Sequence, residues 1–304
     1  MLISVIMNCF NGEIFLKQSI NSILSSNYNN FELIFFDNCS NDNSVKIAES
    51  FNDKRIKICK NFINVNLGEA RKLAVNKSKG ELICFLDVDD LICENTLNKY
   101  VDFFYEFKYD IIYGGVQYID ANGNIINSYS PSFDTKIDIS KLLINFDVNV
   151  PSMCFHRNIF SKYKLNFDPI IKCCEEFAII THAAVLHAKI FSVNEIFSSY
   201  RIHDSSLTHL NLNIGAIERR YILDNIKHLV KSDHKKIYDF AYFKSYYYDS
   251  LYLAKKGDLK AAKKELKKAY NYGNIFKILY WVFLISPKLW LFIHKIKGRR
   301  IIKI

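Results

Sequence analysis

The sequence predicts an α/β fold, in which a mostly parallel sheet is flanked by helices and followed by a C-terminal helical region. Three observations support this prediction. Apolar runs of strand length alternate with segments of helical periodicity over residues 3–205. The polar residues Asn8, Asp37 and Asp87 each end one of these apolar runs. From about residue 206 onward the strand pattern stops and only helical patterns continue.

The first hundred residues show four apolar runs, each followed by a helical pattern. We expect strands at 3–7, 31–36, 55–59 and 81–86, and helices at 14–25, 43–51, 68–78 and 92–108. Such alternation favours parallel pairing. In open parallel sheets, ligands bind beyond the carboxyl ends of the strands. We therefore expect Asn8, Asp37 and Asp87 to lie along one such edge.

The later elements follow the same criteria. Strand material is expected at 109–130, with a turn at Asn122-Gly123, and again at 150–156 and 190–201. Helices are expected at 138–147, 175–188, 214–231, 235–256 and 258–272. We accordingly divide the chain into a first domain at 1–205, with halves at 1–100 and 101–205, and a helical region at 206–304.

The two regions differ in charge. Residues 1–205 contain 20 Lys and Arg against 24 Asp and Glu, whereas residues 206–304 contain 21 against 7. A basic region of this kind can meet nucleic acid or an anionic membrane surface. The eight cysteines form no CxxC pair, and Met1 leads directly into the first strand, so we expect no signal peptide and a cytoplasmic location.

An acidic cluster stands at the end of the fourth apolar run, in the segment ELICFLDVDD at 81–90. The Asp-x-Asp spacing places Asp87 and Asp89 on the same side of an extended segment, in reach of one divalent cation. Mg²⁺ and Mn²⁺ take oxygen ligands and often bind one or two carboxylates together with substrate phosphates. The alternative is a solvated turn in which Asp90 caps the following helix.

Several ordered motifs carry a family resemblance. The segments ISVIMNCFNGEIFLKQSINSIL (3–24), FFDNCSNDNS (35–44) and NLGEARKLAVNKSKGELICFLDVDD (66–90) resemble the family 2, GT-A-fold glycosyltransferases of bacterial polysaccharide and lipooligosaccharide synthesis. The resemblance extends over residues 3–205 and is strongest over 3–100. It implies a Rossmann-like GT-A domain that binds a nucleoside-diphosphate sugar.

The resemblance implies nucleotide-binding roles for residues in the first half. Phe10 and Asn11 would meet the base, Asp37 the base and ribose, and Arg71 the nucleotide, unless Arg71 is only a surface charge on its helix. Asn38 replaces the family's second Asp. Its amide oxygen can still accept a hydrogen bond from the uracil imide N–H, so a UDP-sugar remains the favoured donor, and GDP or another nucleotide donor stays open as an alternative.

Metal and phosphate roles are implied for the acidic segment and for Tyr200-Arg201-Ile202-His203, which resembles the family's Tyr-Arg-x-His motif. Asp89 would be the main ligand of Mn²⁺ or Mg²⁺, and Asp87 would contact the ribose or the metal. His203 would add a metal ligand or contact the diphosphate, and Arg201 would offset phosphate charge.

The general base is implied by Cys174-Glu175-Glu176-Phe177, which resembles the family's Glu-Asp-aromatic motif. Glu176 stands at the Asp position and would deprotonate the acceptor hydroxyl, with Glu175 as the alternative. A structural interpretation is also open, because a carboxylate in the first turn of a helix interacts favourably with the helix dipole.

These roles imply inverting, metal-dependent transfer of a hexosyl or N-acetylhexosaminyl group to a hydroxyl of a glycan or lipid-linked glycan, in cell-surface polysaccharide synthesis. Two alternatives remain open at this point: a phosphohydrolase with Asp87 as nucleophile, and a catalytically silent glycosyltransferase-like binding protein. A Rossmann dehydrogenase is disfavoured because no GxGxxG follows the first strand.

The C-terminal segment 275–304 combines apolar blocks with Lys and Arg. Its longest uncharged run, 278–287, is shorter than the roughly 20 residues of a spanning helix. We expect a helix that lies in the interface of an anionic membrane with Trp281 and Trp290 as anchors, peripheral on the inner face of the cell membrane. The alternatives are packing on its own domain or in a homo-oligomer, and spanning. The apolar blocks disfavour nucleic acid as the partner.

Overall fold

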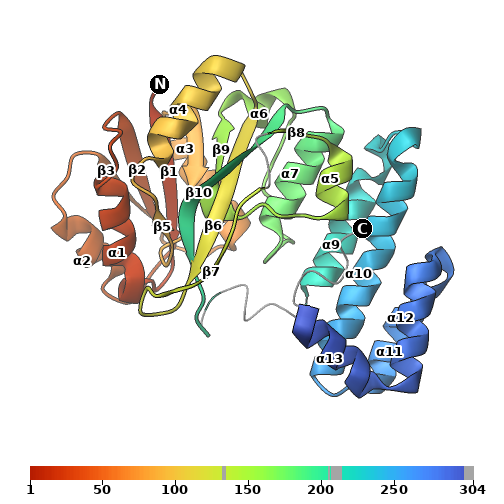
Figure 1. Cartoon of the computed structure of the whole chain (residues 1–304). Coiled ribbons are helices and arrows are strands. Elements are labelled where there is room, and N and C mark those ends of the chain that lie inside the picture. The colour runs from red at the N-terminus through yellow and green to blue at the C-terminus, as the bar shows by residue number, and fades with distance from the viewer. Residues whose placement is uncertain (132–134, 205, 207–213, 298–304) are drawn as a thin grey trace. The chain divides into compact units, whose positions relative to one another are not determined.

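The structure, a computed structural model, describes residues 1–131, 135–204, 206 and 214–297. The chain divides into two compact units, drawn in Figure 1. The first unit comprises residues 1–138 and 147–206, and the second comprises residues 139–146 and 207–304. The short segment 139–146 therefore lies with the second unit, which the sequence pattern did not indicate.

A ten-stranded sheet organises the first unit, and its strand order is β3-β2-β1-β4-β9-β6-β10-β5, with β7 beside β6 and β8 beside β10. The strands are β1 Ile3–Cys9, β2 Phe31–Asp37, β3 Ile56–Lys60, β4 Leu82–Phe85, β5 Leu91–Ile92, β6 Ile111–Ile119, β7 Ile125–Tyr129, β8 Thr135–Ile137, β9 Met153–His156 and β10 Ile190–Arg201. The α/β fold predicted from the sequence is confirmed.

Strand direction decides where the functional residues gather. The strands β1, β2, β3 and β4 pair in parallel. Because β9 is antiparallel to both β4 and β6, and β10 is parallel to β6, the strands β6 and β10 run in the same direction as β4. The carboxyl ends of β1, β2, β4, β6 and β10 therefore lie along one edge of the sheet.

Helices flank this sheet. In the first unit they are α1 Glu13–Leu24, α2 Ser44–Ser50, α3 Leu67–Lys77, α4 Thr96–Phe107, α6 Asn158–Lys162 and α7 Glu175–Val185, with a 3₁₀ turn at Val150–Ser152. Helix α3 begins where the Asn66 side chain accepts a hydrogen bond from the Glu69 N–H at 2.9 Å. Helix α4 begins later than predicted, because Leu91 and Ile92 pair with β10.

The core of the first unit explains why the two first strands are mostly apolar. All seven residues of β2 are buried, as are six of the seven in β1. On one face, Val5 and Leu33 pack in a cluster with Leu16 of α1 and Tyr100 of α4. Polar side chains lie near both ends of these strands: Ser4 donates to Glu32 at 2.6 Å near the amino ends, and Asp37 ends β2.

The second unit is helical, as the sequence predicts. It contains α5 Ile139–Ile144, α9 Gly215–Ile226, α10 Lys235–Lys255, α11 Leu259–Ala269, α12 Asn274–Ile285 and α13 Pro287–Lys297, with 3₁₀ turns at Lys227–Leu229, Ser232–His234 and Tyr270–Tyr272. The α10–α11 hairpin turns at Gly257, whose φ of +90° suits glycine, and Asp258 caps α11 by accepting from the Ala261 N–H at 2.9 Å.

The C-terminal segment forms two helices, because the chain breaks at Ser286-Pro287. One expectation for this segment needs correction. Trp290 is fully buried against Tyr247 and Phe283, so it belongs to the core of the second unit and is no membrane anchor. Trp281, by contrast, is 54% exposed. Among the described residues, every helix is too short or too polar to cross a membrane.

Candidate active site

The acidic segment after β4 lies at the carboxyl edge of the sheet, and each of its three carboxylates has a different partner. Asp87 Oδ1 accepts from Arg71 Nη2 at 3.0 Å. Asp89 Oδ2 lies 2.8 Å from His203 Nε2. Asp90 Oδ1 accepts from the Arg201 N–H at 2.8 Å. The alternative of a helix cap at Asp90 is wrong, since Asp90 is buried and bonds to β10.

Crowding makes this segment electrostatically unusual. Burial, together with the charge of Asp87, raises the pKa of Asp89, against the opposing effect of His203. Burial and the charges of Asp89 and Asp87 raise the pKa of Asp90 well above its ordinary value. Asp90 Oδ2 is buried and has no hydrogen-bond partner within the described part of the chain. A divalent cation would relieve this repulsion, so the oxygen-rich set fits Mg²⁺ or Mn²⁺.

Arg201 lies beneath the acidic segment. Its guanidinium donates to the Asp89 carbonyl at 2.8 Å and to Gln18 Oε1 at 2.9 Å, and it reaches two further carbonyls in the turn after β6. It also stacks over the Phe15 ring at 4.5 Å. The side chain is almost fully buried and holds the segment's backbone in place. Its contact with phosphate stays a prediction.

Two further residues support this segment, and the sequence analysis did not identify them. Ser19 of α1 donates its hydroxyl to the Asp90 carbonyl at 2.6 Å and lies 3.1 Å from the Asp87 carbonyl. Gln18 accepts from Arg201. A signal for Ser19 was present, because it is a polar residue on the apolar, buried face of its helix, beside Leu16 and Ile20.

At the carboxyl end of β2, Asp37 is buried and its carboxylate faces the N–H of Ser40 at 3.2 Å. Phe10 is 54% exposed beyond β1. Asn11 adopts φ of +53° and accepts from the Asn41 N–H at 2.9 Å, which ties the loop after β1 to the loop after β2. Phe10, Asn11 and Asp37 thus lie at neighbouring strand ends, since Cys9 and Asp37 are paired in register.

Asn38 is engaged with the protein backbone. Its Nδ2 donates to the Val65 carbonyl at 2.7 Å, and its Oδ1 accepts from the Val65 N–H at 3.1 Å. Both ends of the amide therefore hold the loop that precedes α3. An aspartate could accept one of these bonds but could not donate the other. The expectation that Asn38 contacts the nucleotide base stays a prediction. In the structure its amide instead holds the loop before α3.

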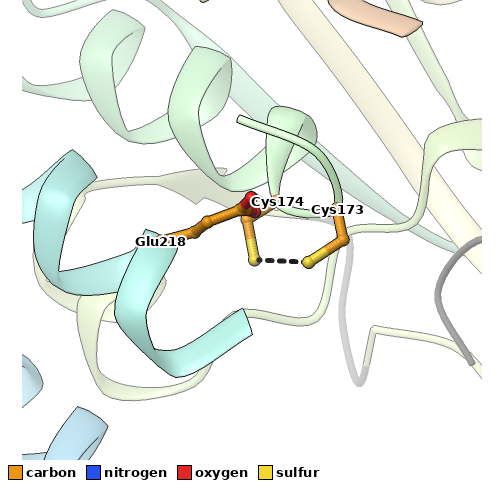
Figure 2. A group of neighbouring side chains, drawn as sticks. All are labelled: Cys173, Cys174 and Glu218. Atoms are coloured by element: carbon orange, nitrogen blue, oxygen red, sulfur yellow. Dashed lines mark hydrogen bonds between the residues drawn. The ribbon is translucent and has the colours of Figure 1, made fainter. Parts of the chain in front are cut away.

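The candidate base lies at the start of α7. Glu175 is buried, whereas Glu176 is half-buried. Arg71 of α3 lies between this helix and the acidic segment, with Nη1 at 3.9 Å from Glu175 Oε2. Arg71 is itself 3% exposed, so its alternative interpretation as a surface helix charge is wrong. Just before the two glutamates, the Sγ atoms of Cys173 and Cys174 lie 4.0 Å apart (Figure 2).

The comparison with known families agrees with this geometry. Residues 4–165, more than half of the chain, match the family described as Glycosyl transferase family 2. The chain belongs to this family. The family resemblance predicted from the sequence motifs is therefore confirmed.

Curated glycosyltransferases are similar to this family 2 chain over part of their length. An uncharacterized glycosyltransferase of Haemophilus influenzae is 36% identical over 144 residues, which are 47% of this chain and 57% of that protein. The UDP-Glc:alpha-D-GlcNAc-diphosphoundecaprenol beta-1,3-glucosyltransferase WfgD of Escherichia coli is 30% identical over 166 residues, 55% of this chain and 64% of WfgD. The matches thus span less than two thirds of these relatives.

Solved structures share the fold of this family 2 glycosyltransferase. S. aureus TarS 1-349 in complex with UDP-GlcNAc superposes with a TM-score of 0.69 at 16% identity, covering 99% of this chain and 92% of that chain. The mannosyltransferase PcManGT of Pyrobaculum calidifontis, in complex with GDP-Man and Mn²⁺, gives 0.62 at 13% identity, covering 97% and 86%. At these identities the likeness concerns the fold alone.

Proposed function

We propose that this family 2 glycosyltransferase moves a hexosyl or N-acetylhexosaminyl group from a nucleoside-diphosphate sugar, with UDP favoured, to a hydroxyl of a glycan or lipid-linked glycan in cell-surface polysaccharide synthesis. The observation that carries the proposal is that Arg71 contacts both Asp87 of the acidic segment and Glu175 at the start of α7, where the half-buried Glu176 is the next residue. The activity named for WfgD and the donors bound by TarS and PcManGT support this donor class.

The cation-binding part consists of Asp89, Asp87 and His203. When bound there, Mn²⁺ or Mg²⁺ would stabilise the negative charge that develops on the departing nucleoside diphosphate. The chain itself holds these carboxylates in position to bind the cation. Arg201 and Ser19 fix the backbone of the acidic segment, and His203 orients Asp89. In this proposal, the nucleoside contacts Phe10, Asn11 and Asp37.

Glu176 is the general base of the proposed reaction. It removes the proton of the acceptor hydroxyl as that oxygen attacks the anomeric carbon, and the bond to the diphosphate breaks on the opposite side. This single displacement inverts the anomeric configuration and needs no covalent enzyme intermediate. Glu175 is less suited, since it is buried and faces Arg71.

The second unit is proposed to hold the enzyme on an anionic membrane surface, at the cytoplasmic face. Exposed apolar side chains follow one another along α12 and α13: Ile278, Trp281, Leu284, Ile285, Leu289 and Phe292. Exposed lysines cover α11: Lys260, Lys263, Lys264, Lys267 and Lys268. Apolar and aromatic side chains beside lysines are the combination that interfacial helices use on acidic lipids.

Sedimentation with vesicles tests this membrane role. The intact protein should pellet with phosphatidylglycerol vesicles and much less with phosphatidylcholine vesicles. The double variant Trp281→Ser/Ile285→Ser should lose this binding, whereas Ile125→Ser, an exposed residue of β7 in the first unit, should retain it. Equal pelleting of both variants would overturn the assignment.

A donor screen tests the catalytic proposal. Thermal midpoints are measured with UDP-, GDP- and dTDP-sugars, with and without Mn²⁺, followed by assays for sugar transfer to glycan acceptors. We expect UDP-sugars with Mn²⁺ to give the largest shift. Glu176→Gln should keep the shift but lose transfer. Release of phosphate from phosphomonoesters without any donor-dependent shift would favour the phosphohydrolase, and donor binding by the intact enzyme without transfer would favour a silent binding protein.

A further inference from the structure

Arg71 occupies an unusual place for an arginine on a helix. Its side chain is 4% exposed and lies between two carboxylates from distant parts of the first unit. Nη2 contacts Asp87 Oδ1 at 3.0 Å, and Nη1 lies 3.9 Å from Glu175 Oε2. The guanidinium carbon also lies 5.6 Å from the centre of the Phe85 ring. The planar, forked guanidinium can serve two carboxylates at once, which an ammonium group does less well.

The electrostatics of Arg71 match a bridging role. Burial opposes its charge, but the carboxylates of Asp87, Glu175 and Glu176 raise its pKa above the ordinary value. An arginine buried to this degree is costly to desolvate unless it is paired, and removing one partner of such a set is strongly destabilising to the group that remains. Arg71 is thus expected to stay paired with its carboxylates and not to turn toward solvent.

Glu175 and its neighbour Glu176 differ in how far their side chains are buried. The Glu175 side chain is 5% exposed and faces Arg71, whereas Glu176, one residue later in the first turn of α7, is half-buried. Successive helical residues point about 100° apart, so one glutamate can face inward while the next faces the edge of the site. The two glutamates therefore differ in position: Glu175 faces Arg71, and Glu176 occupies the more exposed place.

We propose that Arg71 and Glu175 are positioning residues. The Arg71 guanidinium clamps the Asp87 carboxylate to the Glu175 carboxylate, and so sets the distance between the donor-binding segment and the base Glu176. This inference depends on the proposed transferase function. It replaces two earlier expectations, in which Arg71 approached the nucleotide and Glu175 was a second candidate base. Misplacing a base by about 1 Å costs up to roughly 100-fold in rate, so such a clamp has a kinetic consequence.

Steady-state kinetics of the full chain tests the clamp through the separate responses of kcat and donor KM. Glu175→Gln should lower kcat by about 10- to 100-fold and change donor KM by less than about two-fold, because donor contacts remain. Arg71→Met should lower kcat at least as far, and Arg71→Lys should restore part of it. The double variant Arg71→Met/Glu175→Gln should be no slower than Arg71→Met alone, since both changes remove the same link.

The matched control is Lys72→Met, which removes the half-exposed cation next to Arg71 on the same helix. It should leave both constants unchanged. Two kinetic results would contradict the clamp: Glu175→Gln keeps the wild-type kcat, or the two single effects multiply in the double variant. A fall in kcat that only follows the fraction of folded protein, measured by thermal unfolding, would contradict it as well. If the wild-type chain transfers no sugar from any donor, the proposed function itself fails, which is a different outcome.

Discussion

The two units treat charge in opposite ways. The first gathers carboxylates at the edge of its sheet and keeps some of them buried, as with Asp90 at 2% exposure. The second builds an almost wholly aromatic and aliphatic cluster around Tyr247, Phe276, Phe283 and Trp290, and leaves its lysines on the surface of α11. The first unit thus contains carboxylates that repel one another, and the second contains well-packed aromatic rings.

This difference separates activity from stability. Like charges held together in the first unit reduce its stability, and in the proposed mechanism a bound cation would offset their repulsion. Buried rings in the second unit contribute to stability through apolar area and packing. Substitutions that remove charge from the acidic segment should therefore affect chemistry, whereas substitutions in the aromatic cluster should affect folding.

The largest expected effect is that of Asp89→Asn. Transfer should fall by on the order of 100-fold or more, because the proposed main cation ligand is lost. The thermal midpoint should stay the same or rise, because one of three crowded carboxylates becomes neutral. Activity assays and thermal unfolding measure the two effects, with the exposed Asp102→Asn of α4 as the control. A variant that loses activity only by unfolding would contradict the comparison.

The reciprocal test is Trp290→Ala in the second unit. Removing a fully buried ring should lower the free energy of unfolding by about 3–5 kcal/mol. Trp281→Ala, at an exposed position one helix earlier, should change it by less than about 0.5 kcal/mol. Denaturant titration monitored by circular dichroism measures both. Equal losses would show that the ring of Trp281 also packs in solution.

Lys244 sharpens the comparison because it is a buried cation in the unit that otherwise exposes them. Burial, with a contribution from Arg219, lowers the pKa of Lys244 to about 8, while Nζ donates to the Ile144 carbonyl at 2.8 Å. The unfolded chain therefore binds more protons between about pH 8 and 10.5, and stability contributed by this group should rise with pH across that window.

The size of this effect should be on the order of 2 kcal/mol. Denaturant titrations at pH 7.5 and pH 10 are compared for the wild type and for Lys244→Met. The wild type should gain stability relative to the variant at the higher pH. The exposed Lys260→Met of α11 serves as the control and should follow the wild type. If the stability of the wild type and of Lys244→Met changed equally between pH 7.5 and pH 10, the lowered pKa of Lys244 would be contradicted.

The smallest expected effect is that of Asn38→Asp in the first unit. The carboxylate cannot donate to the Val65 carbonyl, so about 1–2 kcal/mol of stability should be lost. Asn76→Asp, an exposed position on α3, should be close to neutral. Thermal unfolding followed by donor titration measures the change. Unchanged stability with weaker donor binding would instead favour a contact between Asn38 and the nucleotide base of the donor.

The sequence alone was sufficient for the alternation of strands and helices over residues 3–86 and for the position of Asp37 and Asp87 at strand ends. Periodicity reports which face of a local element is apolar, and parallel pairing then brings the strand ends together. The motif order was sufficient for the family. The sequence was also sufficient for the hairpin at Gly257, because turn residues act locally.

Only the tertiary structure decided which side chains meet. Arg71 and Arg201 both stand in motifs that carry the family resemblance, yet one faces carboxylates and the other faces backbone carbonyls. Trp281 and Trp290 both lie within apolar blocks, yet one is exposed and the other is buried. The physical reason is that burial and pairing depend on neighbours contributed by other elements. Local composition does not encode those neighbours, and packing among distant segments selects them.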